Sequence, residues 1–450
     1  MKPALPMELQ HHQVADDVYL SFQPSAPLRK STLISIVAFV LGVTIIYVYS
    51  PYSFSLYVNP TSLSTGNSSS LLNNDSIATN DGSLIAEPDN NNESDVVKNE
   101  ETCDLSSGEW VPNPDAPYYT NVTCPGMYNL QNCMKFGKPS MSFLEWRWKP
   151  DGCELPTFDP NRFLQLVRGK SITFVGDSLA RNHMQSLICL LSGVVYPVDL
   201  SPGDNKKNGN QHWVYRDYNF NISLFWNPFL VRAEMTDPSN AFGSYNLFLD
   251  ECDEQWTSKI EGHNYIIISA ALWYIKTNMF YENRTLVGCE DCELENVTKL
   301  SAFYGYEKAL RTALRGINSL KNFHGLTFLR TITPTHFEGG GWNEGGDCVR
   351  TKPFRRNETV LAPHLAEMYR IQVRELKTAE EEGISKTGLR FRLIDVTKPM
   401  LLRPDGHPSK YGRKSGSNMP NDCTHWCMPG PVDTWNEILL ELIRREEAKT

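Results

Sequence analysis

Residues 171–191 read Ser171-Ile-Thr-Phe-Val-Gly-Asp-Ser-Leu-Ala-Arg-Asn-His-Met-Gln-Ser-Leu-Ile-Cys-Leu-Leu191. The run Ile172–Val175 is apolar and β-branched, it ends at Gly176-Asp177, and apolar residues then recur at helical spacing. This pattern predicts a strand, a tight turn and a helix. Ser178 lies at the turn, where the free N–H groups and the dipole of a helix N-terminus can stabilise an oxyanion. The stretch is therefore typical of a serine nucleophile, although Gly-Asp-Ser also occurs as an ordinary turn with an N-cap.

Beyond this stretch, short apolar runs alternate with amphipathic, helix-like segments. The apolar runs are Ile222–Trp226, Tyr265–Ile268, Leu326–Arg330 and Arg390–Asp395, and the helix-like segments include 299–322 and 363–383. This alternation predicts an α/β fold with a mainly parallel sheet flanked by helices. Sites in such folds form at the carboxyl ends of the strands, which is where Ser178 falls.

The cysteines and the charge limit the class of protein. All eleven cysteines lie beyond residue 100, which indicates an oxidising compartment rather than the cytosol. The formal net charge is -9 and there is no basic run, which argues against a nucleic-acid partner. Cys289-Glu-Asp-Cys292 has the spacing of half a zinc site, but no second close Cys or His pair completes it, so no metal is expected.

The N-terminal part of the chain has the pattern of a membrane anchor followed by a stem. Arg29-Lys30 precede an uncharged apolar run from Leu33 to Tyr49, which at about 1.5 Å per residue just spans a bilayer. A cleaved signal peptide is the alternative, but the run starts late and no small-x-small cleavage site follows it. Because the basic pair favours a cytoplasmic N-terminus, we expect a type II anchor. The expected parts are a cytoplasmic tail (1–30), a transmembrane anchor (31–50) and a flexible, Ser- and Asn-rich stem (51–101).

The folded region begins near Cys103 and divides into two parts. Residues 102–158 are loop-rich and contain four cysteines, which predicts a disulfide-stapled lobe beside a core of residues 159–450. In a lumenal domain the Asn-x-Ser/Thr sequons are glycosylation candidates, and they begin at Asn121, Asn221, Asn283, Asn296 and Asn357.

A serine nucleophile needs a base, and the base needs an orienting group. His425 is the most suggestive base, because Asp422 lies three residues earlier and can reach its Nδ1–H. Cysteines flank His425, and they would fix its loop if they are bridged elsewhere. His336 and His407, both in turn-like sequence, remain alternatives for the base, and Asp422 as a simple turn cap is the alternative for the motif. His183 falls on another side of its helix, so we expect a surface or packing residue there.

Several ordered motifs together resemble the plant trichome birefringence-like family, whose members are anchored Golgi polysaccharide O-acetyltransferases related in fold to SGNH/GDSL esterases. The resemblance covers roughly Cys103 to the C-terminus. The motifs are Trp110-Val111, Trp146-Arg147-Trp148, Cys153-x-Leu-Pro156, Phe174 to Asn182 with Gly176-Asp177-Ser178, and Asp422-x-x-His425. The resemblance implies an SGNH/GDSL-like core.

It also implies roles for single residues. Ser178 would be the nucleophile, His425 the general base and Asp422 its partner in a double displacement through an acetyl-enzyme. Backbone N–H groups at and near Ser178 would stabilise the oxyanion, with the Asn182 side chain as a further donor, while Asp177 would shape the turn. Other candidates are Gly176 and Arg181 for site support, and Trp273, Tyr274, His336 and Glu338 for binding the acceptor.

The family's disulfides would pair Cys103 with Cys153, Cys124 with Cys189, Cys133 with Cys427, and Cys348 with Cys423. Cys289 and Cys292 would then form a local bridge and leave Cys252 as the odd thiol. This pairing would tie the loop around His425 to both parts of the folded region.

The segment Leu401-Leu-Arg-Pro-Asp-Gly-His-Pro408 is among those that look most like the xyloglucan-acetylating branch of the family, whereas a neighbouring branch acetylates mannans. One departure is Ser269-Ala-Ala-Leu-Trp273, where that branch usually reads Ser-x-Gly-[His/Gln]-Trp. Ala271 adds a β-carbon at the carboxyl edge of the sheet, and Leu272 cannot hydrogen-bond a sugar. Altered acceptor choice or reduced activity is therefore expected.

The expected function is Golgi-lumenal acetyl transfer to a plant cell-wall hemicellulose, with the side chains of xyloglucan as the expected acceptor. The partners would be the polysaccharide, an acetyl donor and a membrane protein that supplies acetyl groups, with no cofactor. The alternatives are acetylation of mannan, xylan or pectin, hydrolysis by a polysaccharide acetyl esterase, and non-catalytic polysaccharide binding.

Overall fold

The computed structural model describes residues 103–201, 209–237, 243–386, 388–414 and 419–449. Its centre is a seven-stranded sheet in the order β13-β12-β9-β3-β6-β5-β4. The strands are β3 (Ser171–Gly176), β4 (Val198–Asp199), β5 (Gln211–Tyr215), β6 (Phe220–Trp226), β9 (Tyr265–Ser269), β12 (Leu326–Arg330) and β13 (Arg390–Ile394). The five strands from β13 to β6 are parallel, and β5 and β4 extend that edge in antiparallel pairs. The predicted α/β fold with a mainly parallel sheet is confirmed.

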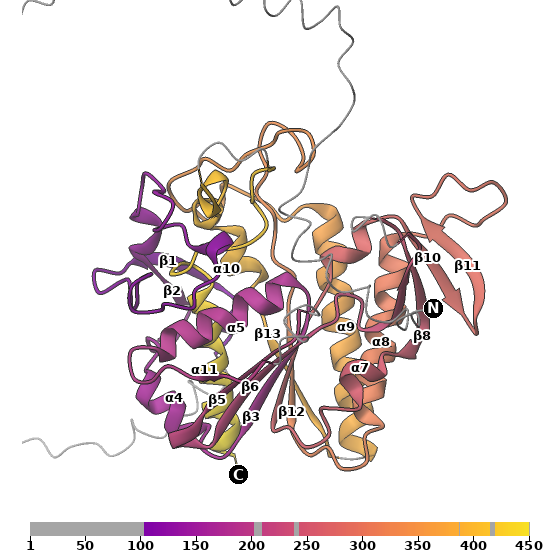
Figure 1. Ribbon diagram of the computed structural model, residues 1–450, viewed down its shortest axis with the longest axis horizontal. Helices are drawn as coiled ribbons and strands as arrows, with labels where there is room; N and C mark the ends of the chain where they lie inside the picture. The colour runs from indigo at the N-terminus through magenta and orange to yellow at the C-terminus, as the bar shows by residue number, and fades with distance from the viewer. Residues whose placement is uncertain (1–102, 202–208, 238–242, 387, 415–418, 450) are drawn as a thin grey trace, which may run out of the picture. The chain divides into compact units, whose positions relative to one another are not determined.

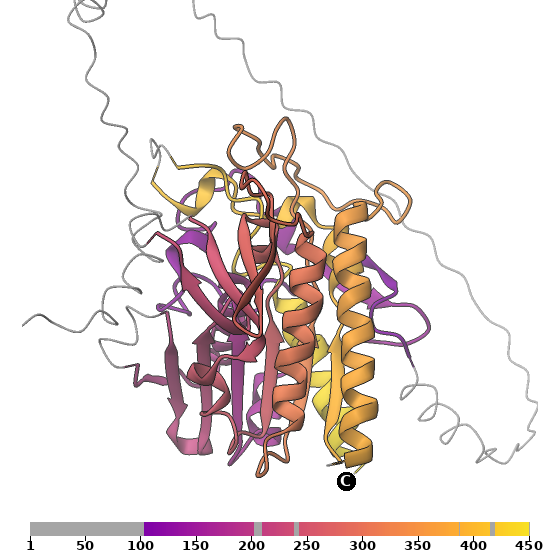
Figure 2. The same cartoon turned by 90° about the vertical axis from the view of Figure 1, so that its right-hand side faces the viewer.

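Helices cover both faces of this sheet (Figure 1). One face carries α5 (Ser178–Leu191) packed beside α11 (Asp433–Glu447), with α4 (Pro160–Leu166) next to α5. The other carries α8 (Ala302–Asn318) and α9 (Pro363–Lys386), which lie side by side in Figure 2.

Alternate side chains of the central strands serve the two faces, because successive residues of a strand point to opposite sides. In β3, Phe174 packs in the apolar cluster with α5 and α11, whereas Val175 packs in the cluster with α8 and α9. In β9, Ile267 and Ile268 divide in the same way. Burial on both faces explains why these strands are nearly continuous apolar runs.

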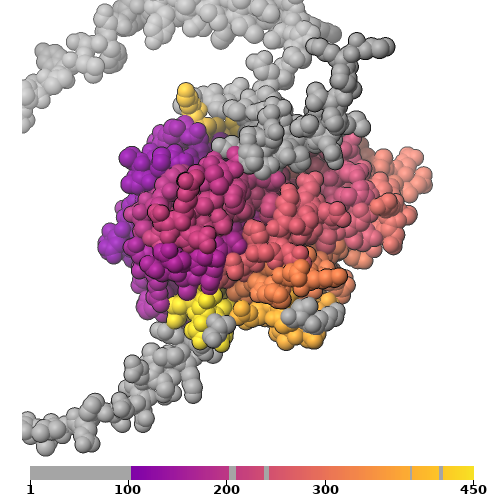
Figure 3. Space-filling view, turned by 60° about the horizontal axis from the view of Figure 1, so that its bottom comes forward, coloured from indigo at the N-terminus to yellow at the C-terminus, as the bar shows by residue number. Residues whose placement is uncertain are grey.

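Ion pairs join the last turn of α11 to the amino-terminal edge of the sheet. Glu447 pairs with Lys170 and accepts a hydrogen bond from the hydroxyl of Tyr265. Glu446 is buried and pairs with Arg390 and Arg392 of β13. Figure 3 shows this end of the chain in yellow, between magenta and orange segments. The opposite, carboxyl edge is left for the loops that follow the strands.

A second, four-stranded sheet has the order β11-β10-β8-β7 and was not predicted. Its strands are β7 (Val231–Met235), β8 (Tyr245–Cys252), β10 (Asn278–Glu282) and β11 (Thr285–Glu290), and α8 packs against β8. Short helices complete the core and the loops, and they are α7 (Glu254–Thr257), α10 (Thr397–Leu401), η2 (Asn129–Gln131), η3 (Ser142–Leu144), η4 (Arg216–Tyr218), η5 (Leu272–Ile275), η6 (Pro404–Gly406) and η7 (Lys410–Gly412).

Residues 103–158 form a loop-rich lobe with one antiparallel pair, β1 (Gly108–Pro112) and β2 (Trp146–Pro150). The indole of Trp110 donates to the carbonyl of Pro399 at 2.9 Å, and the guanidinium of Arg403 lies over its ring. These contacts hold the lobe against the core.

Four of the five disulfides of the structure are the pairs that the resemblance implied, and the fifth is the expected local bridge. They join Cys103 to Cys153, Cys124 to Cys189, Cys133 to Cys427, Cys289 to Cys292, and Cys348 to Cys423, and Cys252 is a free thiol. Two of them end in the loop that contains His425.

The expected tail, anchor and stem (1–30, 31–50 and 51–101) lie outside the described residues. Within the described ranges, no helix combines the length and the apolar character needed to cross a bilayer. Among the predicted glycosylation sites, Asn283, Asn296 and Asn357 are exposed and Asn121 is half-buried. Asn221 is the least suitable, because it lies inside β6 and pairs with strands on both sides.

Candidate active site

The turn between β3 and α5 positions Ser178 as the first residue of the helix. Gly176 has φ of +156°, and a Cβ there would lie 1.9 Å from the carbonyl oxygen of Ser269, so only glycine fits. Asp177 caps α5 by accepting a hydrogen bond from the N–H of Leu179 at 2.9 Å. Asp177 therefore shapes the turn, as predicted, and Ser178 stays partly exposed at the carboxyl edge of the sheet.

His425 connects Ser178 to Asp422. Its Nε2 lies 2.7 Å from Oγ of Ser178, and its Nδ1 lies 2.9 Å from Oδ2 and 3.0 Å from Oδ1 of Asp422. Because a carboxylate can only accept, Nδ1 carries the proton and Nε2 has a lone pair for the serine hydroxyl. The three side chains have the roles that nucleophile, base and orienting acid require.

Asp422 is ionised in this arrangement. Its Oδ1 also accepts from the backbone N–H of His425 at 2.9 Å and of Thr424 at 3.2 Å. Burial by itself would raise the pKa of Asp422, but the electrostatic attraction of the His425 side chain and these hydrogen bonds outweigh it and lower the pKa to about 2. A permanent carboxylate thus faces the imidazole.

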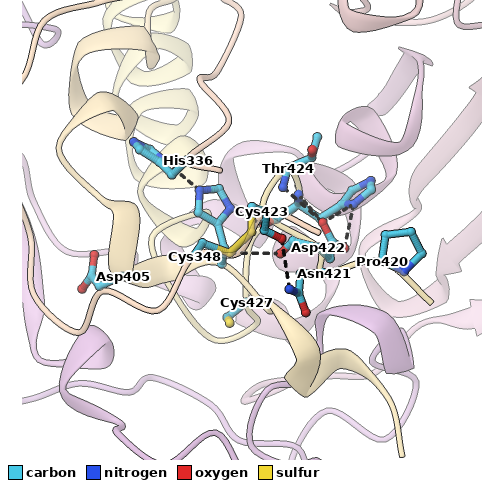
Figure 4. Close-up of a disulfide and its surroundings, with 12 residues drawn as sticks. His336, Cys348, Asp405, Pro420, Asn421, Asp422, Cys423, Thr424 and Cys427 are labelled. Carbon is cyan, nitrogen blue, oxygen red and sulfur yellow. Dashed lines mark hydrogen bonds and ion pairs between the residues drawn. A yellow bond between two sulfur atoms is a disulfide. The ribbon is translucent and has the colours of Figure 1, made fainter. Parts of the chain in front are cut away.

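The loop around His425 is fixed from several sides. Cys423 and Cys427 are bridged to Cys348 and Cys133, and Asp422 exchanges two backbone hydrogen bonds with Ser409 at 2.8 and 3.0 Å. Figure 4 shows the Cys348–Cys423 disulfide directly beside Asp422. Catalytic geometry requires this kind of support, because a base that moves away from its nucleophile is lost to the reaction.

Asn182 belongs to the same support. Its Oδ1 accepts from the N–H of Trp426 at 2.8 Å, and its Nδ2 donates to the carbonyl of Trp426 at 3.3 Å. The expectation that this amide donates to an oxyanion is therefore corrected: it holds the residue after His425 instead.

Arg330 is a site residue that the sequence reasoning missed. Its side chain is buried, and Nε and Nη2 both donate to Oγ of Ser269, at 2.8 and 2.5 Å. Burial lowers the pKa of Arg330 to about 10, so the group stays charged, and its charge opposes the rise in pKa that burial causes at Asp177. Arg330 therefore fixes the end of β9 against the Gly176 turn. The available signal was a cation at the end of a mostly apolar strand.

The predicted acceptor-binding residues separate into two groups. Tyr274 is fully buried and its hydroxyl donates to the carbonyl of Phe229, so it does not reach the site. Both ring nitrogens of His336 are hydrogen-bonded within the protein, and Glu338 pairs with Arg350. Trp273 remains, because its indole ring is only half-buried.

Trp226, at the last position of β6 and in register with Gly176, lies beside Trp273. The two indole rings meet edge to face, with centroids 5.9 Å apart. Arg181, three residues after Ser178 on α5, lies over the ring of Trp226 at 5.1 Å and over that of Tyr128 at 4.9 Å. Half-exposed aromatic rings and a guanidinium thus gather beside Ser178.

The departure at Ala271-Leu272 lies at this same edge. The backbone of Ala271 hydrogen-bonds the carboxylate of Asp177, and its side chain is buried. Leu272 begins η5 and packs against the apolar clusters on both sides of the sheet. Neither residue offers a polar side chain to the site.

Comparison with known proteins identifies the family. The model of the PC-esterase family, described as a GDSL/SGNH-like acyl-esterase family found in Pmr5 and Cas1p, matches residues 155–442. The chain belongs to the PC-esterase family. The matched range contains Ser178, Asp422 and His425, and a model of the PMR5 N-terminal domain matches residues 101–154 directly before it.

Similar PC-esterases come from two plants. "Protein trichome birefringence-like 19" of Arabidopsis thaliana is 51% identical over 80% of this chain and 85% of its own length. "Xyloglucan O-acetyltransferase 4" of Populus trichocarpa is 39% identical over 77% of this chain and 82% of its own. "Xyloglucan O-acetyltransferase 3" of the same species is 40% identical over 78% and 88%.

Proposed function

We propose that this PC-esterase is a polysaccharide O-acetyltransferase that acetylates a plant cell-wall hemicellulose, with xyloglucan side chains as the acceptor. The observation that carries the proposal is the hydrogen-bonded series from Asp422 through His425 to Ser178 at the carboxyl edge of the sheet. The names of two relatives, at 39% and 40% identity, support the choice of acceptor.

In the first half-reaction, Oγ of Ser178 attacks the carbonyl carbon of an acetyl donor while Nε2 of His425 accepts the hydroxyl proton. The oxyanion of the tetrahedral intermediate faces the N–H of Ser178 at the start of α5, where the helix dipole favours negative charge. Collapse breaks the bond to the leaving group, which takes the proton from His425. The product is acetyl-Ser178.

In the second half-reaction, a sugar hydroxyl gives its proton to Nε2 of His425 and attacks the acetyl carbon. The new ester forms on the sugar, the bond to Ser178 breaks, and Oγ regains the proton. The carboxylate of Asp422 stabilises the imidazolium in both halves. No cofactor is needed besides the acetyl donor.

The acceptor would lie over Trp226, Trp273 and Arg181. Aromatic rings offer flat apolar faces to a sugar, and a guanidinium offers several hydrogen-bond donors. Because Leu272 replaces a polar residue at this edge, contacts to the acceptor would rest more on stacking than on hydrogen bonds.

The proposed location is the Golgi lumen, behind a type II anchor at 31–50. Five disulfides support an oxidising compartment. The proposed partner is a membrane protein that supplies acetyl groups to the lumen.

An acetyl esterase is the second candidate, because the family is described as acyl-esterases and Ser178 is partly exposed to water. To separate the two, the full-length protein is incubated with p-nitrophenyl acetate and xyloglucan oligosaccharides, with Asp422→Asn as control. Mass spectrometry that finds acetylated oligosaccharides supports the transferase, and release of acetate alone supports the esterase. No product above the Asp422→Asn baseline would contradict both.

A further inference from the structure

Two histidines form a hydrogen-bonded chain behind the base. His407 is fully buried and follows η6, and His336 is half-buried in the segment after β12. Nδ1 of His336 lies 2.7 Å from Nε2 of His407. The ring of His407 packs on that of Trp426 with centroids 4.1 Å apart. The pair therefore contacts the residue that follows His425.

The outer nitrogens of the pair both face backbone carbonyls. Nδ1 of His407 lies 2.7 Å from the carbonyl oxygen of His425, and Nε2 of His336 lies 3.1 Å from that of Leu401. A carbonyl oxygen can only accept a hydrogen bond. Each outer nitrogen must therefore carry a proton.

The inner contact, between Nδ1 of His336 and Nε2 of His407, needs a proton of its own. A neutral imidazole carries one proton, so two neutral rings with both outer nitrogens protonated would place two lone pairs 2.7 Å apart. A third proton, shared between the inner nitrogens, completes all three hydrogen bonds. Without it, the pair must give up one bond, either to Leu401 or to the backbone of His425.

Given the acyl transfer proposed at Ser178, we propose that His336 and His407 are positioning residues that share one extra proton. This proton keeps His407 bonded to the carbonyl of His425 and so holds the base against Ser178. When the pair loses the proton, His407 can turn its remaining N–H toward His336, and the backbone of His425 loses a support.

The surroundings of the pair set the direction of the pH effect. The groups that favour the proton are the carboxylates of Asp405, Asp422 and Glu338, and those that oppose it are Lys138 and Arg350. Lys138 donates to the carbonyls of Asp405 and His407, and Arg403 pairs with Asp405 at 2.8 Å. Burial dominates and lowers the pKa of both histidines. The extra proton is therefore lost as pH rises, and it is lost at a lower pH than the proton of an exposed histidine.

The pH profile of kcat for acetyl transfer tests the proposal. Loss of the shared proton should give the profile a falling limb of about tenfold per pH unit. In His336→Gln, the amide can donate to Nε2 of His407 without an extra proton, so the falling limb should disappear. His324→Gln, at an exposed histidine, is the matched control and should keep it. A falling limb that is the same in His336→Gln would overturn the proposal.

A second measurement does not depend on activity. Nitrogen NMR of the full-length protein with 15N-labelled histidine counts ring N–H groups, and the signals missing in His336→Gln and in His407→Gln identify the two rings. Three N–H groups on the two rings are expected at pH values below the falling limb and two above it, and the same count on both sides would overturn the sharing. Three N–H groups in a protein without transfer activity at any pH would instead contradict the proposed function.

Discussion

Nε2 of His425 lies 2.7 Å from Oγ of Ser178, although 247 residues separate them in the sequence. The turn after β3 presents Ser178 at the carboxyl edge of the sheet, and two disulfides and the amide of Asn182 hold the loop of His425 over it. The distance between these two side chains therefore depends on contacts that are themselves far apart in sequence.

Asp422→Asn should reduce acetyl transfer on the order of 10⁴-fold, because an amide can donate to Nδ1 and so favours the wrong imidazole tautomer. The measurement is kcat with a defined acetyl ester and xyloglucan oligosaccharides. Combining Asp422→Asn with Ser178→Ala should cost no more than Ser178→Ala alone, since groups that act as a unit are not additive. If the double variant is much slower than either single variant, Asp422 and Ser178 do not act as one unit, which would contradict the proposed mechanism.

Asn182→Ala should lower both stability and kcat. The change leaves the buried N–H and carbonyl of Trp426 without partners, at about 1–3 kcal/mol for each group. Urea unfolding measures the first effect and steady-state kinetics the second. A variant with normal stability and a large loss of kcat would point back to a donor role for Asn182 at the oxyanion.

The Cys348–Cys423 disulfide should matter for activity as well as for stability. Its two cysteines lie 75 positions apart in the sequence, and Cys423 is next to Asp422. In the chain-entropy account, a disulfide that closes a loop of this size stabilises the folded state by about 4 kcal/mol. Replacing both cysteines by serine should lower kcat and the melting temperature. The matched control is the Cys289–Cys292 pair, whose cysteines lie three positions apart. This pair is far from Ser178 in the sequence. Equal losses of activity in both double variants would contradict a role specific to the site loop.

Glu437→Gln should stabilise the protein at pH 8 and have little effect at pH 5. Burial, and then the charge of Asp433, raise the pKa of Glu437 from 4.5 to about 7. The folded state therefore binds this proton more tightly than the unfolded state, so stability falls as pH rises from about 4.5 through 7, by roughly 3 kcal/mol. Urea midpoints at the two pH values measure the difference. A stabilisation that is the same at both would rule out this buried carboxyl as the cause.

Much of the central sheet could be predicted from sequence for a physical reason. Leu326–Arg330 has the bounds that its apolar run indicates, because a strand buried on both faces leaves an uninterrupted signal. The second sheet was missed because strands such as β10 and β11 are partly exposed and mix polar with apolar residues. Short mixed strands of this kind depend on the neighbour they pair with.

For the candidate site, too, some residues could be predicted from sequence and others could not. Ser178, Asp422 and His425 lie in local motifs whose spacing indicates their chemistry, so sequence alone was enough to nominate them. Tyr274 was misjudged, because η5 turns its ring inward toward Phe229, and no local pattern reports that direction. The role of Arg330 is likewise set by tertiary packing against Ser269.

The most direct test of the account is to trap the acetyl-enzyme. The full-length protein is mixed with an activated acetyl ester, quenched in acid, and the peptide that contains Ser178 is analysed by mass spectrometry. The account predicts one acetyl group on Ser178, which disappears when xyloglucan oligosaccharides are added while the same group is found on the sugar. Acetyl transfer to the sugar by a Ser178→Ala variant would contradict it.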